Sequence, residues 1–398
     1  MQQSPPTTRS LPGWPSFDQE QIDAVSEVLA SGKVNYWTGD EGRHFEREFA
    51  DYVGVNHGIA LANGSVAIEL ALHALGIGAG DEVIVTPRTF IASASSIVIV
   101  GATPVFADVD ADTQNISAAT IAPHIGPRTR AIICVHLAGW PCDMEPIMAL
   151  AQQHDLRVIE DCAQAHGARY RGRPVGSFGD MAAFSFCQDK IMTTGGEGGM
   201  LVTDSEGLWD RAWSYKDHGK RYATVYRPRE PHETGFRWVH ESFGTNFRMT
   251  EMQAAIGRIQ LRRLDDWVAQ RRRNAARLVE RLTGEPLLRI PLPGDDIGHA
   301  YYKFYAFLDE ARLKTDWTRD RIVGEIVARG VPCFSGSCSE VYDEKAFTDS
   351  PFRQVQRLPV AHALGGQSLM LLVHPTLTED DMDFMASVVR DVLAQAAR

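Results

Sequence analysis

The chain has 398 residues, of which 44% are hydrophobic and 23% charged, and its formal net charge is −11. These proportions are typical of a folded globular protein and exclude a disordered or fibrous chain, while the length predicts one large and one smaller domain. The negative charge argues against a general nucleic-acid-binding protein, which would carry a basic patch, so no nucleic-acid partner is expected.

The N-terminal segment 1–16 lacks an apolar signal core, and the most apolar later run, 91–107, is interrupted by Ser, Gly and Pro. We therefore expect no membrane association and a cytoplasmic location. In such a chain the six cysteines are expected to be reduced and without a disulfide framework. Cys333 and Cys338 are near neighbours, but a structural metal needs about four ligands at tight spacing. No metal site is predicted.

The first half of the chain alternates between helical and strand-like patterns. A helix is predicted over 16–34, with a glycine at its end, and we expect it to pack across a domain boundary or a subunit interface. Further helices are predicted over 65–76, closed by a glycine, and over 143–155, capped by Asp143. Seven short strand-like runs occupy 57–62, 81–87, 103–110, 129–137, 156–162, 180–186 and 199–204. Because several are apolar throughout, they predict one sheet covered by helices on both faces, an α/β fold.

The composition changes after about residue 250. An arginine-rich helical pattern covers 249–282, and strand-like runs cover 301–308 and 371–375 before an amphipathic helix closes the chain over 379–397. Acids are interleaved with the arginines, which favours a solvated helix face over a nucleic-acid-binding surface. We place a large domain at 1–250 and a smaller α+β domain at 251–398.

Lys190 lies in a glycine-rich stretch, 184–199, and Asp161 ends the predicted strand 156–162. A partly buried lysine can attack an aldehyde because burial favours its neutral amine. A carboxylate at a strand end can keep a pyridine nitrogen protonated. Together the two residues suggest a pyridoxal-phosphate (PLP) site. Taken singly, Lys190 could equally be a solvated loop residue and Asp161 a helix cap.

A phosphate-binding segment is predicted where the strand 57–62 meets the next helix. Gly64, Ser65 and Val66 would present backbone N–H groups and the positive end of the helix dipole to an anion. Ser185, at the end of another strand, could add its hydroxyl, since strand ends converge at one edge of a parallel sheet. The alternative is an ordinary turn with Ser65 as the helix cap.

Blocks of sequence over most of the chain resemble the DegT/DnrJ/EryC1/StrS family of sugar aminotransferases. The blocks include WTGDEGRHFEREFADYVG, ANGSVAIELAL, VIEDCAQAHGA, GSFGDMAAFSF and GTNFRMTEMQAAIG, and the resemblance runs from about residue 30 to the C-terminus. These relatives are PLP enzymes of the aspartate-aminotransferase fold (fold type I). The resemblance implies a large domain with a mostly parallel seven-stranded sheet flanked by helices, and a smaller α+β C-terminal domain.

The resemblance also implies a role for each site residue. Lys190 corresponds to the lysine that binds PLP and then acts as general base and acid, and Asp161 to the carboxylate on the pyridine nitrogen. Gln164 corresponds to the residue beside the cofactor's phenolic oxygen, and Phe90 to the ring stacked on the pyridine. Without the resemblance, Phe90 would be interpreted as a core residue.

The phosphate contacts implied by the resemblance are Gly64, Ser65 and Ser185. Asn246 corresponds to an asparagine that reaches the phosphate from the partner subunit, which implies a homodimer. Unaided, Asn246 would be interpreted as a turn residue. Two features depart from the family pattern: Cys187 stands where many relatives have histidine, and the loop 193–199 has an additional glycine.

The implied reaction transfers an amino group from L-glutamate to the keto group of a nucleotide-diphospho-deoxysugar, in polysaccharide or secondary-metabolite biosynthesis. A PLP-dependent sugar dehydratase is the alternative enzyme, but those relatives replace the lysine, commonly with histidine, whereas Lys190 is present. A non-catalytic regulatory relative is disfavoured because Lys190, Asp161 and Gln164 are all intact. The unusual segment 332–347 is expected to bear on substrate choice.

Overall fold

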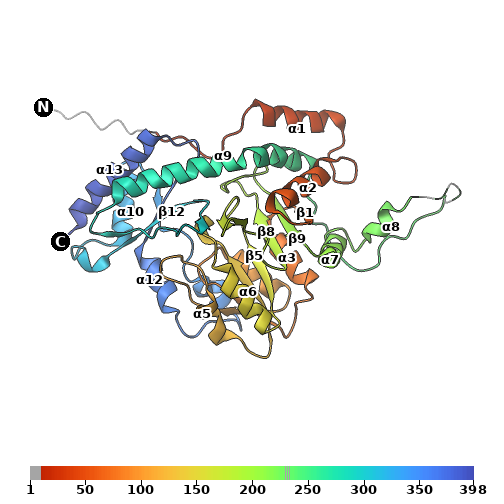
Figure 1. Cartoon of the computed structure of the whole chain (residues 1–398), viewed down its shortest axis with the longest axis horizontal. Helices are drawn as coiled ribbons and strands as arrows, with labels where there is room; N and C mark the ends of the chain where they lie inside the picture. The colour runs from red at the N-terminus through yellow and green to blue at the C-terminus, as the bar shows by residue number, and fades with distance from the viewer. Residues whose placement is uncertain (1–9, 229, 231, 233) are drawn as a thin grey trace.

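The computed structural model describes residues 10–228, 230, 232 and 234–398. A seven-stranded sheet with the order β1-β9-β8-β5-β4-β2-β3 forms its centre (Figure 1). The strands are β1 (His57–Leu61), β2 (Glu82–Val85), β3 (Thr103–Phe106), β4 (Thr129–Val135), β5 (Arg157–Asp161), β8 (Met181–Ser185) and β9 (Gly199–Thr203). Each lies within one of the seven predicted runs. Only β9 runs opposite to the others, so the predicted fold class is confirmed.

Helices cover both faces of this sheet because its strands are apolar on both sides. Successive residues of a strand point to opposite faces, and in β1 the side chains of Ile59 and Leu61 join one buried cluster while Ala60 joins another. The first cluster includes α3 (Gly64–Ala74), α4 (Ala92–Ile99) and α6 (Met144–Gln153). The second includes α2 (Glu41–Val53) and the first half of α9 (Glu251–Leu282).

Short-range side-chain hydrogen bonds fix the starts of several helices, whereas others, such as α2 and α4, begin without one. Asp18 and Gln21 form a capping box at α1 (Gln19–Ser31), which lies along α9. Thr250 and Thr378 cap α9 and α13 (Glu379–Ala396) in the same way. The predicted cap of α6 is wrong: Asp143 makes no cap bond and instead accepts a hydrogen bond from the Tyr170 hydroxyl.

A second, antiparallel sheet, β10-β12-β14-β13, forms the C-terminal core. Its strands are β10 (Leu288–Arg289), β12 (Phe304–Leu308), β13 (Cys333–Phe334) and β14 (Ser368–Leu371), and α10 (Arg319–Ala328), α13 and the second half of α9 pack on them. The strand predicted at 371–375 therefore lies earlier in the chain, because Phe304 of β12 pairs with Leu371 at the end of β14.

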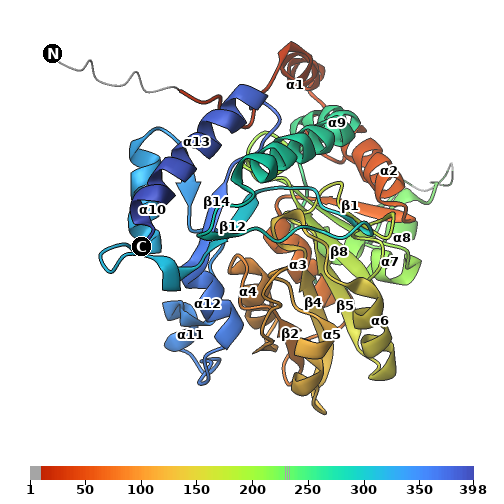
Figure 2. The ribbon, with the colours of Figure 1, turned by 60° about the vertical axis from the view of Figure 1, so that its left-hand side comes forward.

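The C-terminal part also extends into the core of the large sheet. Tyr342 and Phe347 place their rings 5.5 and 5.6 Å from that of Phe106 on β3. The division of the chain at residue 250 stays a prediction, since α9 is shared by two buried clusters. Figure 2 shows the N-terminal segment passing beside α13 before it reaches α1. Among the described residues, no helix has the length and apolar character required to span a membrane.

Candidate active site

The predicted site residues gather at the carboxyl edge of the large sheet. Asp161 and Ser185 end the neighbouring parallel strands β5 and β8. Leu61 and Ser185 both pair with Gly199, so the turn after β1 lies against the end of β8. A Cβ atom built on Gly64 would lie only 2.6 Å from the Cβ of Ser185. The two segments predicted to bind phosphate are thus in direct contact.

The turn after β1 exposes the start of α3. Asn63, not Ser65, is the helix cap, and its side chain accepts a hydrogen bond of 3.0 Å from the Val66 N–H. The N–H groups of Gly64 and Ser65 precede the first hydrogen bonds within the helix and point out of its N-terminus. They offer two donors and the positive end of the dipole to an anion. The Val66 N–H, by contrast, is already engaged by Asn63.

The carboxylate of Asp161 is buried and held by two hydrogen bonds. Its Oδ2 accepts from the Ser93 hydroxyl at 2.7 Å, and its Oδ1 accepts from the Ala163 N–H at 3.1 Å. Ser93 Oγ also lies 2.9 Å from the hydroxyl of Thr89, the residue before Phe90. The first turn of α4 therefore supports Asp161, and the loop directly before this helix carries Phe90.

Phe90 is 67% exposed, so the interpretation of this ring as a core residue is wrong. An exposed aromatic ring at the end of β2 agrees instead with a ring that covers a bound molecule. Gln164 lies on the loop after β5, largely buried, and its Oε1 accepts a hydrogen bond of 2.8 Å from the Ala138 N–H. That bond fixes the side chain and leaves its amide nitrogen available as a donor.

Lys190 lies in the loop between β8 and β9, and its side chain is 15% exposed. Its Nζ is 4.0 Å from Asp189 Oδ1 and 5.1 Å from the centre of the Tyr302 ring. Asp189 also accepts a hydrogen bond from the Tyr302 hydroxyl and lies 3.9 Å from Lys303 Nζ. Burial lowers the pKa of Lys303 to about 8, while Asp189 opposes that change. The lysine loop is thus packed against residues of the C-terminal part.

A buried, neutral histidine lies behind this loop. The ring of His166 is 5.5 Å from that of Phe184 and 5.6 Å from that of Phe186. Burial, followed by the positive charges of Lys190 and Arg271, lowers the pKa of His166 to about 3. The imidazole therefore stays uncharged at neutral pH, and it adds no positive charge to a site that already holds Lys190.

Asn246 is exposed and pairs with Asp217 in a single antiparallel bridge, two residues before Arg248 pairs with Leu61 at the end of β1. It lies at the base of an arm that carries α8 (Tyr222–Tyr226) and projects from the body of the molecule (Figure 1). Asp217 is buried and accepts hydrogen bonds from Lys220 Nζ at 2.9 Å and Arg248 Nη1 at 2.8 Å. These ion pairs fasten the backbone on both sides of Asn246.

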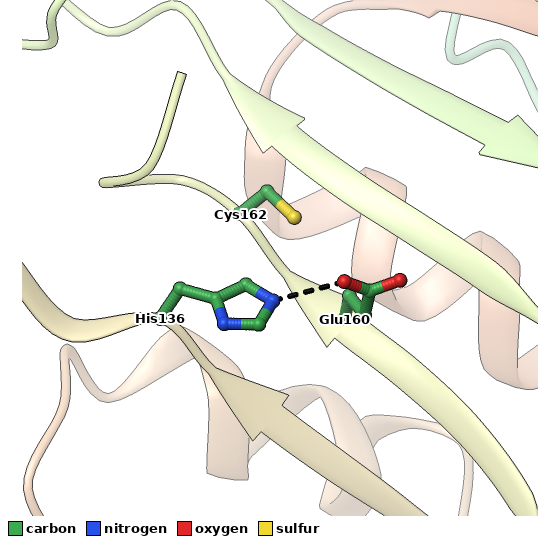
Figure 3. A group of neighbouring side chains, drawn as sticks. All are labelled: His136, Glu160 and Cys162. Carbon is green, nitrogen blue, oxygen red and sulfur yellow. Dashed lines mark hydrogen bonds and ion pairs between the residues drawn. The ribbon is translucent and has the colours of Figure 1, made fainter. Parts of the chain in front are cut away.

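His136, Glu160 and Cys162 form a buried group whose atoms are close enough to hold a metal ion (Figure 3). The Cys142 N–H donates to His136 Nδ1 at 2.9 Å, so Nε2 carries the proton and donates to Glu160 at 3.0 Å. The same carboxylate also accepts from the backbone N–H groups of Gly176, Phe178 and Gly179. The ligand atoms of His136 and Glu160 are thus committed to a hydrogen-bond network that joins the ends of β4 and β5 with the turn 176–179. All six cysteines are free thiols.

Several residues around the site had no signal in the sequence. Ser93, Tyr302 and Trp14 contact Asp161, Lys190 or its loop from distant parts of the chain. Ser93 and Asp161 are 68 positions apart, so no local pattern in the sequence indicates that contact. A cavity of about 550 Å³ between α1 and α9, with charged walls, is lined by none of the predicted site residues.

The fold and the clustered strand ends define an aminotransferase. The sequence model of the DegT/DnrJ/EryC1/StrS aminotransferase family matches residues 15–390. The chain is 40% identical over 393 residues to the GDP-perosamine synthase of Caulobacter vibrioides, covering 95% of this chain and 97% of that protein. It is also 40% identical over 377 residues to the UDP-N-acetyl-3-dehydro-alpha-D-glucosamine 3-aminotransferase of Acidithiobacillus ferrooxidans, covering 94% of each.

A solved aminotransferase from Psychrobacter cryohalolentis matches with a TM-score of 0.94 and 56% sequence identity, covering 97% of this chain and 99% of that one. The protein therefore belongs to the DegT/DnrJ/EryC1/StrS aminotransferase family, and the predicted family is confirmed.

Proposed function

We propose that the protein uses PLP to transfer an amino group from L-glutamate to the keto group of a nucleotide-linked sugar. The observation that carries the proposal is that three features lie together at one edge of the sheet. They are Asp161, the contact between Gly64 and Ser185, and the loop that carries Lys190. The acceptor class rests on the two relatives that share 40% identity, one named for a GDP-linked and the other for a UDP-linked sugar.

The residues of this chain fit PLP, and one observation that supports the fit does not depend on the relatives. A Cβ on Gly64 would fill the space beside Ser185, so glycine keeps open a cradle for a phosphate. The helix N-terminus at Gly64 and Ser65 supplies N–H donors, and Ser185 supplies a hydroxyl. Asp161 provides a buried carboxylate for a pyridinium, and the exposed ring of Phe90 provides a flat apolar surface.

PLP, when bound, supplies the electron sink that makes the amino-acid carbon acidic. Lys190 would hold the cofactor through its amine, and the same amine would take up and return the proton during the transfer. The side chain of Lys190 lies between Asp189 and the Tyr302 ring, which limits the directions its amine can take. Ser93 and Ala163 hold the carboxylate of Asp161 in one orientation, and this carboxylate would pair with the pyridinium. Gln164 directs its free amide nitrogen into the same edge.

The proposal includes a homodimer in which Asn246 reaches the partner's phosphate site. Asn246 is exposed, and the projecting arm beside it carries the large apolar side chains Phe236, Trp238 and Phe243, the last 99% exposed. Apolar rings so exposed on an arm are unfavourable in water and fit burial against a second copy. A cytoplasmic location stays a prediction.

The donor reaction can be tested directly on the purified enzyme. Addition of L-glutamate should remove the cofactor's absorption band near the visible edge and release 2-oxoglutarate. A panel of GDP-, UDP- and dTDP-linked keto sugars should then restore the band for the true acceptor. If glutamate leaves the band unchanged while a keto sugar is consumed, the dehydratase alternative replaces this proposal.

A further inference from the structure

We propose that Trp14 is a positioning residue that fixes the backbone of Lys190. It belongs to an N-terminal strap, residues 11–15, in the segment that passes beside α13 (Figure 2), and its indole contacts the lysine loop. The inference rests on the proposed function of Lys190 and adds a residue that the family motifs around the site do not include.

The contact is a hydrogen bond between residues 176 positions apart. Trp14 Nε1 donates to the carbonyl oxygen of Lys190 at 2.8 Å. The N–H of Lys190 donates in turn to the Cys187 carbonyl at 3.1 Å. Both backbone polar groups of the lysine are therefore paired, although residues 187–195 form neither a helix nor a strand. Further along the loop, the Thr193 N–H donates to Gln260 Oε1 at 2.7 Å, so the Trp14 bond restrains the backbone at Lys190 itself, before that point.

The strap is itself firmly held. The indole of Trp14 packs edge-on against Trp267 of α9, with ring centres 5.1 Å apart, and stacks on His374 at 6.2 Å. The carbonyl of Gly13 accepts a hydrogen bond of 3.0 Å from Thr376 Oγ1. Two segments of the C-terminal half, α9 and the loop 374–376, thus fix the orientation of the indole, whose N–H points at Lys190.

Trp14 also supports the side-chain surroundings of Lys190. The guanidinium carbon of Arg271 lies 5.3 Å from the centre of the Trp14 ring, a cation–π contact. Arg271 is fully buried and donates through Nη1 to the Tyr302 carbonyl at 3.2 Å. The Tyr302 ring in turn flanks the amine of Lys190. Trp14 therefore acts on the lysine from two sides: directly on its backbone, and through Arg271 on the ring beside its amine.

The inference predicts what happens when the indole N–H is removed. Trp14→Phe retains an aromatic ring at this position but has no donor for the Lys190 carbonyl. A net gain of about 1 kcal/mol for a neutral hydrogen bond corresponds to about a fivefold change in an equilibrium constant. The backbone of 187–195 should open about three to ten times more often, and kcat should fall by a similar factor while the KM for the acceptor stays unchanged.

The decisive readout does not require the cofactor. Hydrogen exchange of the apoenzyme, followed by mass spectrometry, should show faster exchange in peptides covering 187–195 for Trp14→Phe. Trp267→Phe is the matched control, because it removes an indole from the same aromatic group but not the donor to Lys190. Peptides from β5 and α3 should exchange at the wild-type rate in both variants.

Unchanged exchange at 187–195 in Trp14→Phe overturns the inference, as does an increase spread evenly over the whole chain. If Trp14→Phe does not fold, Thr376→Val provides the test, because it removes the bond that anchors the strap at Gly13. It must then increase exchange at 187–195, and wild-type exchange there overturns the inference. Failure of the proposed function appears separately, as a cofactor that still binds covalently in Lys190→Ala.

Discussion

Substitution of Gly64 by alanine should weaken both cofactor binding and the fold, by amounts that can be measured separately. A Cβ at this position would lie 2.6 Å from Ser185 Cβ and 3.2 Å from its Oγ. The first distance is about 1 Å shorter than the 3.5–4.0 Å at which carbon atoms normally meet. Because β8 is buried on both faces, the start of α3 must move away, and its N–H donors move with it.

The size of the effect follows from the hydrogen bonds that would be lost. Bonds to a charged group contribute about 1.5–3 kcal/mol each, so displacement of one donor should lower PLP affinity about 10- to 150-fold. Overpacking should lower the free energy of unfolding by about 1–3 kcal/mol. Titration of the apoenzyme with PLP measures the first quantity, and urea unfolding without cofactor measures the second.

The matched control is Gly207→Ala in the first turn of α7 (Glu206–Lys216), where an added Cβ meets nothing within 4 Å. It should leave PLP affinity unchanged and raise stability by at most about 1 kcal/mol, since alanine favours helix. If Gly64→Ala binds PLP within twofold of the wild type, the turn does not hold the phosphate and the placement of the cofactor is wrong.

Three further changes test the interior around the site. Glu160→Gln should lower the free energy of unfolding, measured in urea, by about 2–4 kcal/mol. The described partners of the carboxylate are all donors, and the N–H donors of an amide group would face them. A loss below about 1 kcal/mol would contradict this. Burial is the main cause that lowers the pKa of His166 and of His299 to about 3. Because each histidine gains a proton on unfolding below about pH 6.5, each should lower the free energy of unfolding by about 1.4 kcal/mol for every pH unit of acidification. His166→Phe should reduce that slope by one residue's share between pH 6 and 5, and an unchanged slope would refute the neutral imidazole. Arg88→Met should lower the free energy of unfolding by about 2–4 kcal/mol, since the buried guanidinium of Arg88 donates to three side chains. In a double-mutant cycle, the coupling energy between Arg88 and Ser339 should be about 1 kcal/mol, and zero coupling would show that this bond is not formed.

The large sheet was predictable because its signal is local. Each strand is a short apolar run bounded by polar residues, and both faces are covered, so the runs stand out without knowledge of their neighbours. Strand ends also carry Asp161 and Ser185, and parallel strands bring their ends together. The sequence alone therefore predicted that Asp161 and Ser185 lie at the same edge of the sheet, as the parallel pairing of β5 and β8 confirms, while the site itself stays a prediction.

The errors and omissions come from contacts that depend on distant residues. Asp143 precedes α6 as a cap would, but the Tyr170 hydroxyl competes for its carboxylate. The last strand was placed at 371–375 because apolar residues continue past Leu371, whereas pairing with β12 decides where the strand lies. Trp14 contacts Lys190 across 176 positions, and such a pair leaves no periodic pattern to detect.

The most direct test of the account is chemical identification of the residue that binds the cofactor. The holoenzyme is reduced with borohydride, digested, and analysed by mass spectrometry. The account predicts that the reduced cofactor is attached to Lys190, and that Lys190→Ala carries none while Lys303→Ala is labelled as the wild type. Attachment to Lys303, to Lys216 or to any other lysine would contradict it.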